Sequence, residues 1–222
     1  MVNKKYKLLK DETLGFGRCK LHRIEALRDF GKVRKGDKGG FIEKESNLSQ
    51  EGDAWVSGNA QVSGNALVSE NARVYGNVRV SGNALVSGNA HVSENALVYG
   101  NAWVFGNARV YGNAQIFGDA LVCGNALVSG NALVSGNARV FGNAQVYGDA
   151  WVSGDAQVSG NALVYENAQV YGDARVSGNA QISGNAQVYG DACVYRDAQV
   201  SGNIQVYANV RGVMFGGYNR GR

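Results

Sequence analysis

The chain has 222 residues, of which 32 are glycine and none is proline, and 18% are charged against 45% that are hydrophobic. The length favours one domain, the composition excludes collagen and argues against disorder, and no apolar run of about 18 residues indicates a transmembrane helix. Residues 1–10 carry four lysines and lack the apolar stretch that a signal peptide needs.

The net charge of +4 is unevenly distributed along the chain. Residues 1–51 carry +5, residues 52–207 carry −4, and the residues from Ala208 onward carry +3. The basic ends could contact nucleic acid or an acidic partner, but the middle has no basic stripe for a duplex, and we expect no membrane partner. Cys19, Cys123 and Cys193 form an odd set without metal-ligand spacing, which favours a reducing, cytoplasmic setting.

Residues 1–45 precede the regular part of the chain and are predicted to form a small β cap. Residues 7–10 and 18–27 are strand-like and are separated by 11–17, which indicates a hairpin, and the glycine-rich stretch 36–40 is typical of a turn. Since a stack of parallel strands exposes an unpaired edge at each end, we expect this hairpin to cover one end.

From Gly52 to Tyr207 the chain consists of 26 consecutive hexapeptides without an insertion or deletion. The unit is Gly-Asn/Asp-Ala-x-Val-y, in which Ala-x-Val-y alternates as a half-buried strand does and the first two residues supply a corner. Because every unit turns in the same sense, the pattern predicts a parallel β-helix. The first slot holds glycine in 22 units and is replaced in the others by Glu70, Glu94, Glu166 and Arg196.

Read from Val62, the run Val-Ser-Gly-Asn-Ala-Gln resembles the hexapeptide-repeat motif of the trimeric LpxA-like superfamily. The resemblance implies an all-β, single-stranded, left-handed parallel β-helix with three hexapeptides in each triangular coil, and therefore about nine coils. The chain also resembles repeat-only bacterial and prophage proteins labelled polymer-forming cytoskeletal or putative transferase. We divide it into a cap at 1–45, a β-helix at 46–210 and a basic Gly/Arg tail at 211–222.

Function is expected at the outward slots x and y, because the other four slots build the coil. With three units per coil, residues 18 apart share a column, and one column is strongly apolar. Such a patch usually marks an interface, here most simply a dimer or trimer, with a second protein as a further partner; the alternative is that these residues only reflect β-propensity. The predicted interface comprises Leu67, Leu85, Trp103, Phe105, Leu121 and Phe141, with Cys123 beside them.

A second face alternates basic and aromatic residues and continues to Tyr147 and Tyr165. Arginine and tyrosine can stack on sugars or bases, so this is a possible ligand face, although we expect it to lack a cleft. Its residues are Arg73, Tyr75, Arg109 and Tyr111.

The sequence predicts no catalytic, cofactor or metal site. His22 and His91 are the only histidines, His91 stands alone in a regular x slot, and no insertion interrupts the coils to build a pocket. We therefore expect a non-enzymatic scaffold or binding protein. Three alternatives stay open: a phage or prophage accessory protein that inhibits a host defence factor, a bactofilin-like filament, which two apparent caps oppose, and a degenerate hexapeptide acyltransferase.

Overall fold

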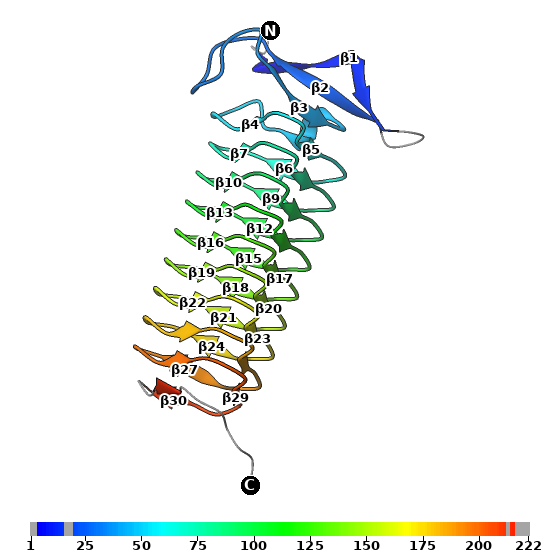
Figure 1. The fold of residues 1–222 in the computed structure, drawn as a ribbon. Helices are drawn as coiled ribbons and strands as arrows, with labels where there is room; N and C mark the ends of the chain where they lie inside the picture. The colour runs from blue at the N-terminus through cyan, green and yellow to red at the C-terminus, as the bar shows by residue number, and fades with distance from the viewer. Residues whose placement is uncertain (1–3, 16–19, 212–213, 216–222) are drawn as a thin grey trace.

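The computed structural model describes residues 4–15, 20–211 and 214–215 as a rod of stacked coils with an antiparallel hairpin at its N-terminal end (Figure 1). Each coil has three short strands and three corners, so the strands form three parallel sheets along the rod. The prediction of an all-β, three-sided parallel β-helix with an N-terminal β cap is confirmed. The left hand of the coil stays a prediction from the resemblance.

Sheet I includes the cap. Its strands, in the order in which they pair, are β1 (Tyr6–Leu14), β2 (Leu21–Ala26), β3 (Lys38–Ile42), β5 (Gln61–Val62), β8 (Arg79–Val80), β11 (Leu97–Val98), β14 (Gln115–Ile116), β17 (Leu133–Val134), β20 (Trp151–Val152), β23 (Gln169–Val170), β26 (Gln187–Val188) and β29 (Gln205–Val206).

Sheet II precedes sheet I around each coil. It contains β4 (Trp55–Val56), β7 (Arg73–Val74), β10 (His91–Val92), β13 (Arg109–Val110), β16 (Leu127–Val128), β19 (Gln145–Val146), β22 (Leu163–Val164), β25 (Gln181–Ile182), β28 (Gln199–Val200) and β31 (Met214–Phe215).

Sheet III completes the triangle. It contains β6 (Leu67–Val68), β9 (Leu85–Val86), β12 (Trp103–Val104), β15 (Leu121–Val122), β18 (Arg139–Val140), β21 (Gln157–Val158), β24 (Arg175–Val176), β27 (Cys193–Tyr195) and β30 (Val210–Arg211). The short 3-10 helix η1 (Glu45–Asn47) lies just before the first coil, and Leu48 then forms a parallel bridge with Val68.

Strand register follows the hexapeptide period directly. Leu67 pairs with Leu85, 18 residues later, and the valine of each unit pairs with the valine of the next coil. Alanine and valine point inward, and Ala66 and Val68, for example, have no exposed surface. Burial of each such valine contributes about 1.5–3 kcal/mol, so a core of stacked valines offsets much of the entropy lost on ordering the chain.

Backbone hydrogen bonds join each coil to the next. The N–H of Gln61 donates to the carbonyl of Val78 in the following coil at 2.9 Å, and the same relation repeats along the rod. The first coil therefore presents carbonyls, without coil partners, toward the cap. The cap has to supply donors for them.

Glycine is favoured at the first corner slot for two reasons. At Gly112 φ is 73°, and a Cβ there would lie 2.7 Å from the carbonyl oxygen of Gly130 in the next coil. Where another residue replaces glycine, the backbone keeps this left-handed conformation, with φ of 58° at Glu70, 63° at Glu94 and 59° at Glu166. Two of these glutamates gain a compensating bond, because Glu94 accepts from the N–H of Gly112 and Glu166 from that of Gly184, at 3.0 and 2.6 Å.

Asparagine side chains form ladders along the corners. The amide nitrogen of Asn107 donates to the side-chain oxygen of Asn125 in the next coil at 3.0 Å, and this ladder continues to Asp197. An aspartate accepts but cannot donate, so it ends a run: Asn101 donates to Asp119, and the next bond in that corner begins at Asn137.

The cap differs from its predicted form in two places. Strand β1 runs on to Leu14 with a register shift between Leu9 and Thr13, so residues 11–14 belong to a strand and not to the hairpin loop. The expected turn at 36–40 is only partly right, because Gly36 lies in a turn but Gly39 and Gly40 lie inside β3. These two glycines allow close packing. A Cβ on Gly39 would lie 2.5 Å from Ile24, and one on Gly40 would lie 2.6 Å from the carbonyl oxygen of Ala60.

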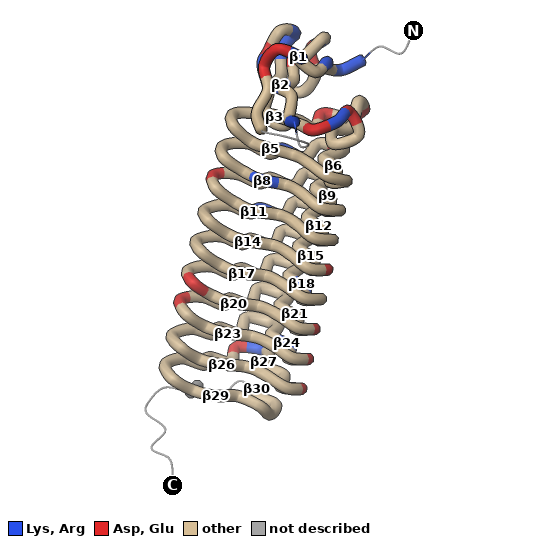
Figure 2. Tube along the Cα trace, turned by 90° about the vertical axis from the view of Figure 1, so that its right-hand side faces the viewer, with Lys and Arg blue, Asp and Glu red and all other residues tan. Residues whose placement is uncertain are grey.

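Charged residues gather on the cap, and few lie along the coils (Figure 2). In the described residues no helix is long and apolar enough to cross a membrane. Cys19, Arg220 and Arg222, together with most of the predicted basic tail, lie outside the described residues.

Candidate functional surfaces

The predicted apolar column lies on the outside of sheet III. Leu67, Leu85, Trp103 and Leu121 occupy successive strands in register. The three leucines are half-buried by their neighbours, whereas Trp103 is 50% exposed. Phe105, Cys123 and Phe141 run alongside them in the y slots and are also half-buried. The structure therefore brings all of the predicted interface residues together on one face.

Both cysteines that the structure describes, Cys123 and Cys193, are free thiols on this face. Burial raises the pKa of the Cys123 thiol above its usual value, which keeps it in the unreactive protonated form at neutral pH. Below Leu121 the column becomes polar, with Arg139 on the next strand.

The predicted ligand face lies on sheet II, and the structure adds His91 to it. His91 pairs with Arg73 on one side and with Arg109 on the other, so the three side chains form one basic column. Burial lowers the pKa of His91, and the positive charges of Arg73, Arg109 and Lys32 lower it further. Within the part of the chain that the structure describes, neither arginine forms an ion pair. His91 is therefore not an isolated surface residue.

A hollow of about 390 Å³ opens on this face. It is a shallow, open depression, in which small Ser93 lies between two large tyrosines. A smaller hollow of about 130 Å³ lies toward the cap, where Lys32 and Asp53 approach Arg73. The larger hollow is lined by Tyr75, His91, Ser93, Glu94, Arg109 and Tyr111.

Further along sheet II, Tyr147 and Tyr165 occupy adjacent coils. Their rings stack with centroids 5.1 Å apart and planes 8° from parallel. Burial, together with the neighbouring Tyr165 and Glu166, raises the pKa of Tyr147. This pair shows how close two aromatic side chains come when they share a column in successive coils.

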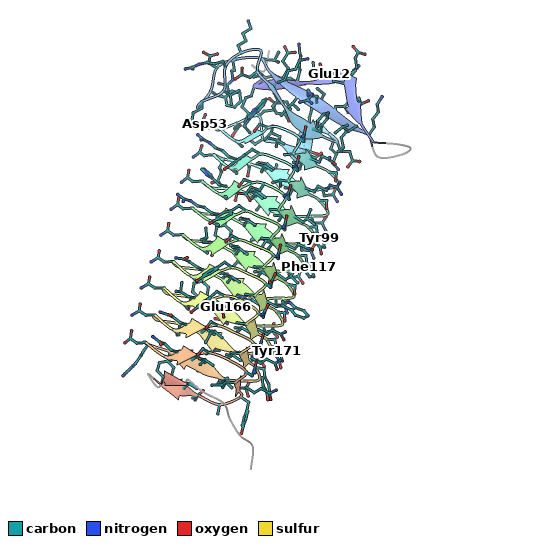
Figure 3. The ribbon with its side chains drawn as sticks, in the orientation of Figure 1. Glu12, Asp53, Tyr99, Phe117, Glu166 and Tyr171 are labelled. Carbon is teal, nitrogen blue, oxygen red and sulfur yellow. The ribbon has the colours of Figure 1, made fainter. Side chains whose placement is uncertain are left out.

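Sheet I carries an aromatic surface that the sequence reasoning missed. Tyr99 stacks on Phe117 at 5.0 Å, and Tyr171 stacks on Tyr189 at 5.3 Å; Figure 3 shows Tyr99, Phe117 and Tyr171 along one side of the rod. Trp151, which is 43% exposed, donates from its indole nitrogen to Ser135 at 3.3 Å. The same 18-residue sorting that found the sheet III column, applied to the third face, would have revealed it.

Among the described residues, no group of three or more His, Cys, Asp or Glu side chains could hold a metal ion. His22 lies on β2 in the cap, far in sequence from His91 on β10, and its buried Nδ1 atom has no hydrogen-bond partner.

Comparison with known proteins identifies the repeat. A search of curated proteins finds no match. A family model described as the YdcK β-solenoid repeat matches more than half of the chain, at residues 60–76, 72–88, 78–94, 114–130, 122–136, 144–157, 156–168, 168–184, 180–196 and 186–202. The narrower resemblance to LpxA-like hexapeptide proteins stays a prediction. From these matches and the coil geometry, the chain belongs to the YdcK β-solenoid repeat family.

Proposed function

We propose that this β-solenoid is a non-enzymatic scaffold that self-associates through the apolar column of sheet III. The observation that carries the proposal is the register of Leu67, Leu85, Trp103 and Leu121 on four adjacent strands. The apolar surface of a flat face of this kind is removed from water only when another flat face covers it.

The difference in charge between sheet III and sheet II favours a second copy of the chain as the occupant of the sheet III face. Between Leu67 and Cys123, all of which the structure describes, the outward strand positions of sheet III hold no charged side chain. Two identical faces can therefore meet without opposing like charges. The corresponding part of sheet II carries Arg73 and Arg109, on the strands to either side of His91, and these arginines would repel their own copies.

The position of Arg139 favours an antiparallel dimer over a parallel arrangement. This arginine follows Leu121 in the same column, so parallel copies would place it against its own counterpart. A two-fold axis that passes between Leu85 and Trp103 instead places Leu85 of one copy against Trp103 of the other. The two copies of Arg139 then lie at opposite ends of the contact. Such a contact is isologous, as in most homodimers. A trimer, which the hexapeptide resemblance implies, is the competing outcome.

The described free thiols Cys123 and Cys193 support a reducing, cytoplasmic setting for this scaffold. The covered N-terminal end opposes open-ended growth into a filament. Inhibition of a host defence factor and a degenerate acyltransferase stay hypotheses that no contact in the structure favours.

The test compares two tryptophans in equivalent slots on different faces. Sedimentation velocity of wild-type protein should give a dimer, and Trp103→Gln should shift it to monomer, while Trp151→Gln on sheet I should not. Glutamine is a conservative choice, since it already fills nine x slots. A monomeric wild type, or equal loss of association in both variants, would overturn the proposal. Leu85→Glu provides a second, charged disruption of the same column.

A further inference from the structure

The hollow on sheet II has features of a small-molecule site that the scaffold function does not use. Its volume of about 390 Å³ falls within the range of roughly 300–1,000 Å³ typical of ligand pockets. It combines two aromatic side chains, a histidine and an arginine, and it lies on regular strands, which hold side chains more rigidly than loops do.

The spacing of the two tyrosines matches one inserted ring. Tyr75 and Tyr111 are two coils apart in one column, with Ser93 between them, so they are separated by about 10 Å along the rod. A flat ring placed at the level of Ser93 would lie about 5 Å from each tyrosine ring, within the usual range for aromatic stacking. That is the spacing that Tyr147 and Tyr165 show in the same sheet, at 5.1 Å.

The neighbouring x column supplies positive charge at the same height. His91 precedes Ser93 by two residues, which is about 6.6 Å along the strand, and Arg73 and Arg109 lie on the strands to either side. Lys32 adds a fourth basic group close enough to lower the pKa of His91. Guanidinium groups without an ion pair can bind an anionic oxygen through two parallel hydrogen bonds.

The one carboxylate at the hollow is already engaged. Glu94 accepts a hydrogen bond from the N–H of Gly112 at 3.0 Å, which holds this side chain along the corner. A ligand with a ring and an anionic group at about 6–7 Å from each other would place the ring between the tyrosines and the anion on the basic column.

We propose that this hollow binds a nucleoside monophosphate, with the base stacked between Tyr75 and Tyr111 over Ser93 and the phosphate held by Arg73 and Arg109 beside His91. Base stacking on aromatic side chains tolerates all four bases, so the site selects for the phosphate and a flat ring more than for a particular base. The open face implies affinity in the high micromolar to millimolar range.

Calorimetry of the full chain with adenosine 5′-monophosphate tests this proposal. We expect saturable binding to one site per chain, at least tenfold weaker binding in Ser93→Tyr and Arg109→Gln, and little change in Ser129→Tyr. Ser129 is a matched control because it lies between Tyr111 and Tyr147 in the same column but beside Leu127 instead of His91. Tyrosine already fills nine y slots, so both serine variants suit the fold.

Three results would overturn the proposal. If adenosine binds as tightly as the monophosphate, the basic column does not contribute to binding. If Ser93→Tyr binds the monophosphate as tightly as wild type, the gap between the tyrosines does not contribute. Equal loss in Ser129→Tyr would indicate stacking anywhere along the column.

The two histidines give a readout that does not depend on any variant. The groups facing His91 are Arg73, Arg109, Lys32, Glu94 and the two tyrosines; burial, and secondly the positive charges of Arg73, Arg109 and Lys32, keeps its pKa low. A bound phosphate should raise that pKa, because its negative charge favours the protonated imidazole. In a proton NMR titration with adenosine 5′-monophosphate, the His91 ring signals should move to a higher pKa while those of His22 in the cap stay in place. Parallel shifts of both histidines would contradict a site at His91.

Discussion

The Nζ atom of Lys5 donates a hydrogen bond to the carbonyl oxygen of Ala54 at 3.0 Å. It also donates to the carbonyls of Glu51 and Gly52, at 3.2 and 3.3 Å, and lies 5.0 Å from the centre of the Phe30 ring. These carbonyls belong to the first coil, whose acceptors have no preceding coil to pair with. The ammonium group thus supplies the donors that a preceding coil would otherwise give these carbonyls.

The stability of the cap should rise with pH because of Lys5. Burial, and secondly the charge of Arg28, lowers the pKa of Lys5 to about 8. The unfolded chain keeps this proton up to a pKa of about 10.4, so between these values the unfolded state binds more protons and the free energy of unfolding increases with pH. We expect wild-type protein to gain stability between about pH 8 and pH 10 relative to Lys5→Met.

Urea unfolding followed by Trp55 fluorescence measures this difference. Trp55 packs in the cap against Phe30 and Tyr6, with ring centres 5.4 and 6.4 Å apart. In a Trp103→Gln, Trp151→Gln background Trp55 is the only tryptophan. A wild-type-minus-variant difference that stays flat across this interval would show that Lys5 is not buried as described.

Tyr6 should have the opposite effect at higher pH. Its hydroxyl lies 2.7 Å from the carbonyl oxygen of Leu48 and 2.8 Å from that of Glu45, and burial, with the charge of Glu45, raises its pKa. Above about pH 10 the unfolded chain ionises while the folded chain keeps its proton, so stability falls as the pH rises. Tyr6→Phe should lose about 1–2 kcal/mol at neutral pH and show a smaller decline above pH 10. The same Trp55 signal reports both; a variant as stable as wild type at neutral pH would argue against the buried hydroxyl bond.

The repeat could be predicted from the sequence because every unit faces the same physical requirement. A corner such as that at Gly112 favours glycine, and the inward slots hold small aliphatic groups, nearly always alanine and valine, so period and register follow together. The same period placed Leu67 against Leu85 and Trp103 against Leu121.

The cap could not be predicted in this detail because its structure depends on contacts remote in sequence. Lys5 lies in a lysine-rich stretch that is typical of a solvated surface, and only the carbonyls near Ala54 explain its burial. Gly39 is typical of a turn until the approach of Ile24 is known. The hollow at Ser93 was predictable in principle, since the column of Tyr75, Ser93 and Tyr111 can be read at 18-residue spacing, but its volume and its other lining residues come only from the structure.

The asparagine ladders predict that the order of Asn and Asp along a corner matters. Asn107 accepts from Asn89 and donates to Asn125, at 3.1 and 3.0 Å. Asn107→Asp removes the donor from the middle of a run and places a carboxylate next to an oxygen acceptor, which should lower the free energy of unfolding by about 1 kcal/mol. Asp119→Asn should raise it by a similar amount, because the new amide could donate to Asn137. Thermal melts of both variants provide the comparison, and shifts of the same sign would contradict the directional ladder.

The positions where another residue replaces glycine at a corner allow two effects to be separated. One is the cost of the strained backbone, and the other is the gain from a side-chain hydrogen bond. Glu70 has φ of 58° and forms no side-chain hydrogen bond within the described residues, whereas Glu166, with φ of 59°, accepts from Gly184 at 2.6 Å. A side chain in this left-handed region is unfavourable by about 1–2 kcal/mol, so Glu70→Gly should stabilise the fold by up to about 1 kcal/mol once the greater freedom of the unfolded glycine is included. Glu166→Gly relieves the same strain but leaves the N–H of Gly184 without its partner, so its gain should be smaller or reversed. Parallel denaturant titrations of the two variants measure the difference between them, which isolates the contribution of the carboxylate. Equal stabilisation of both would mean that the bond from Gly184 to Glu166 contributes nothing beyond what water supplies.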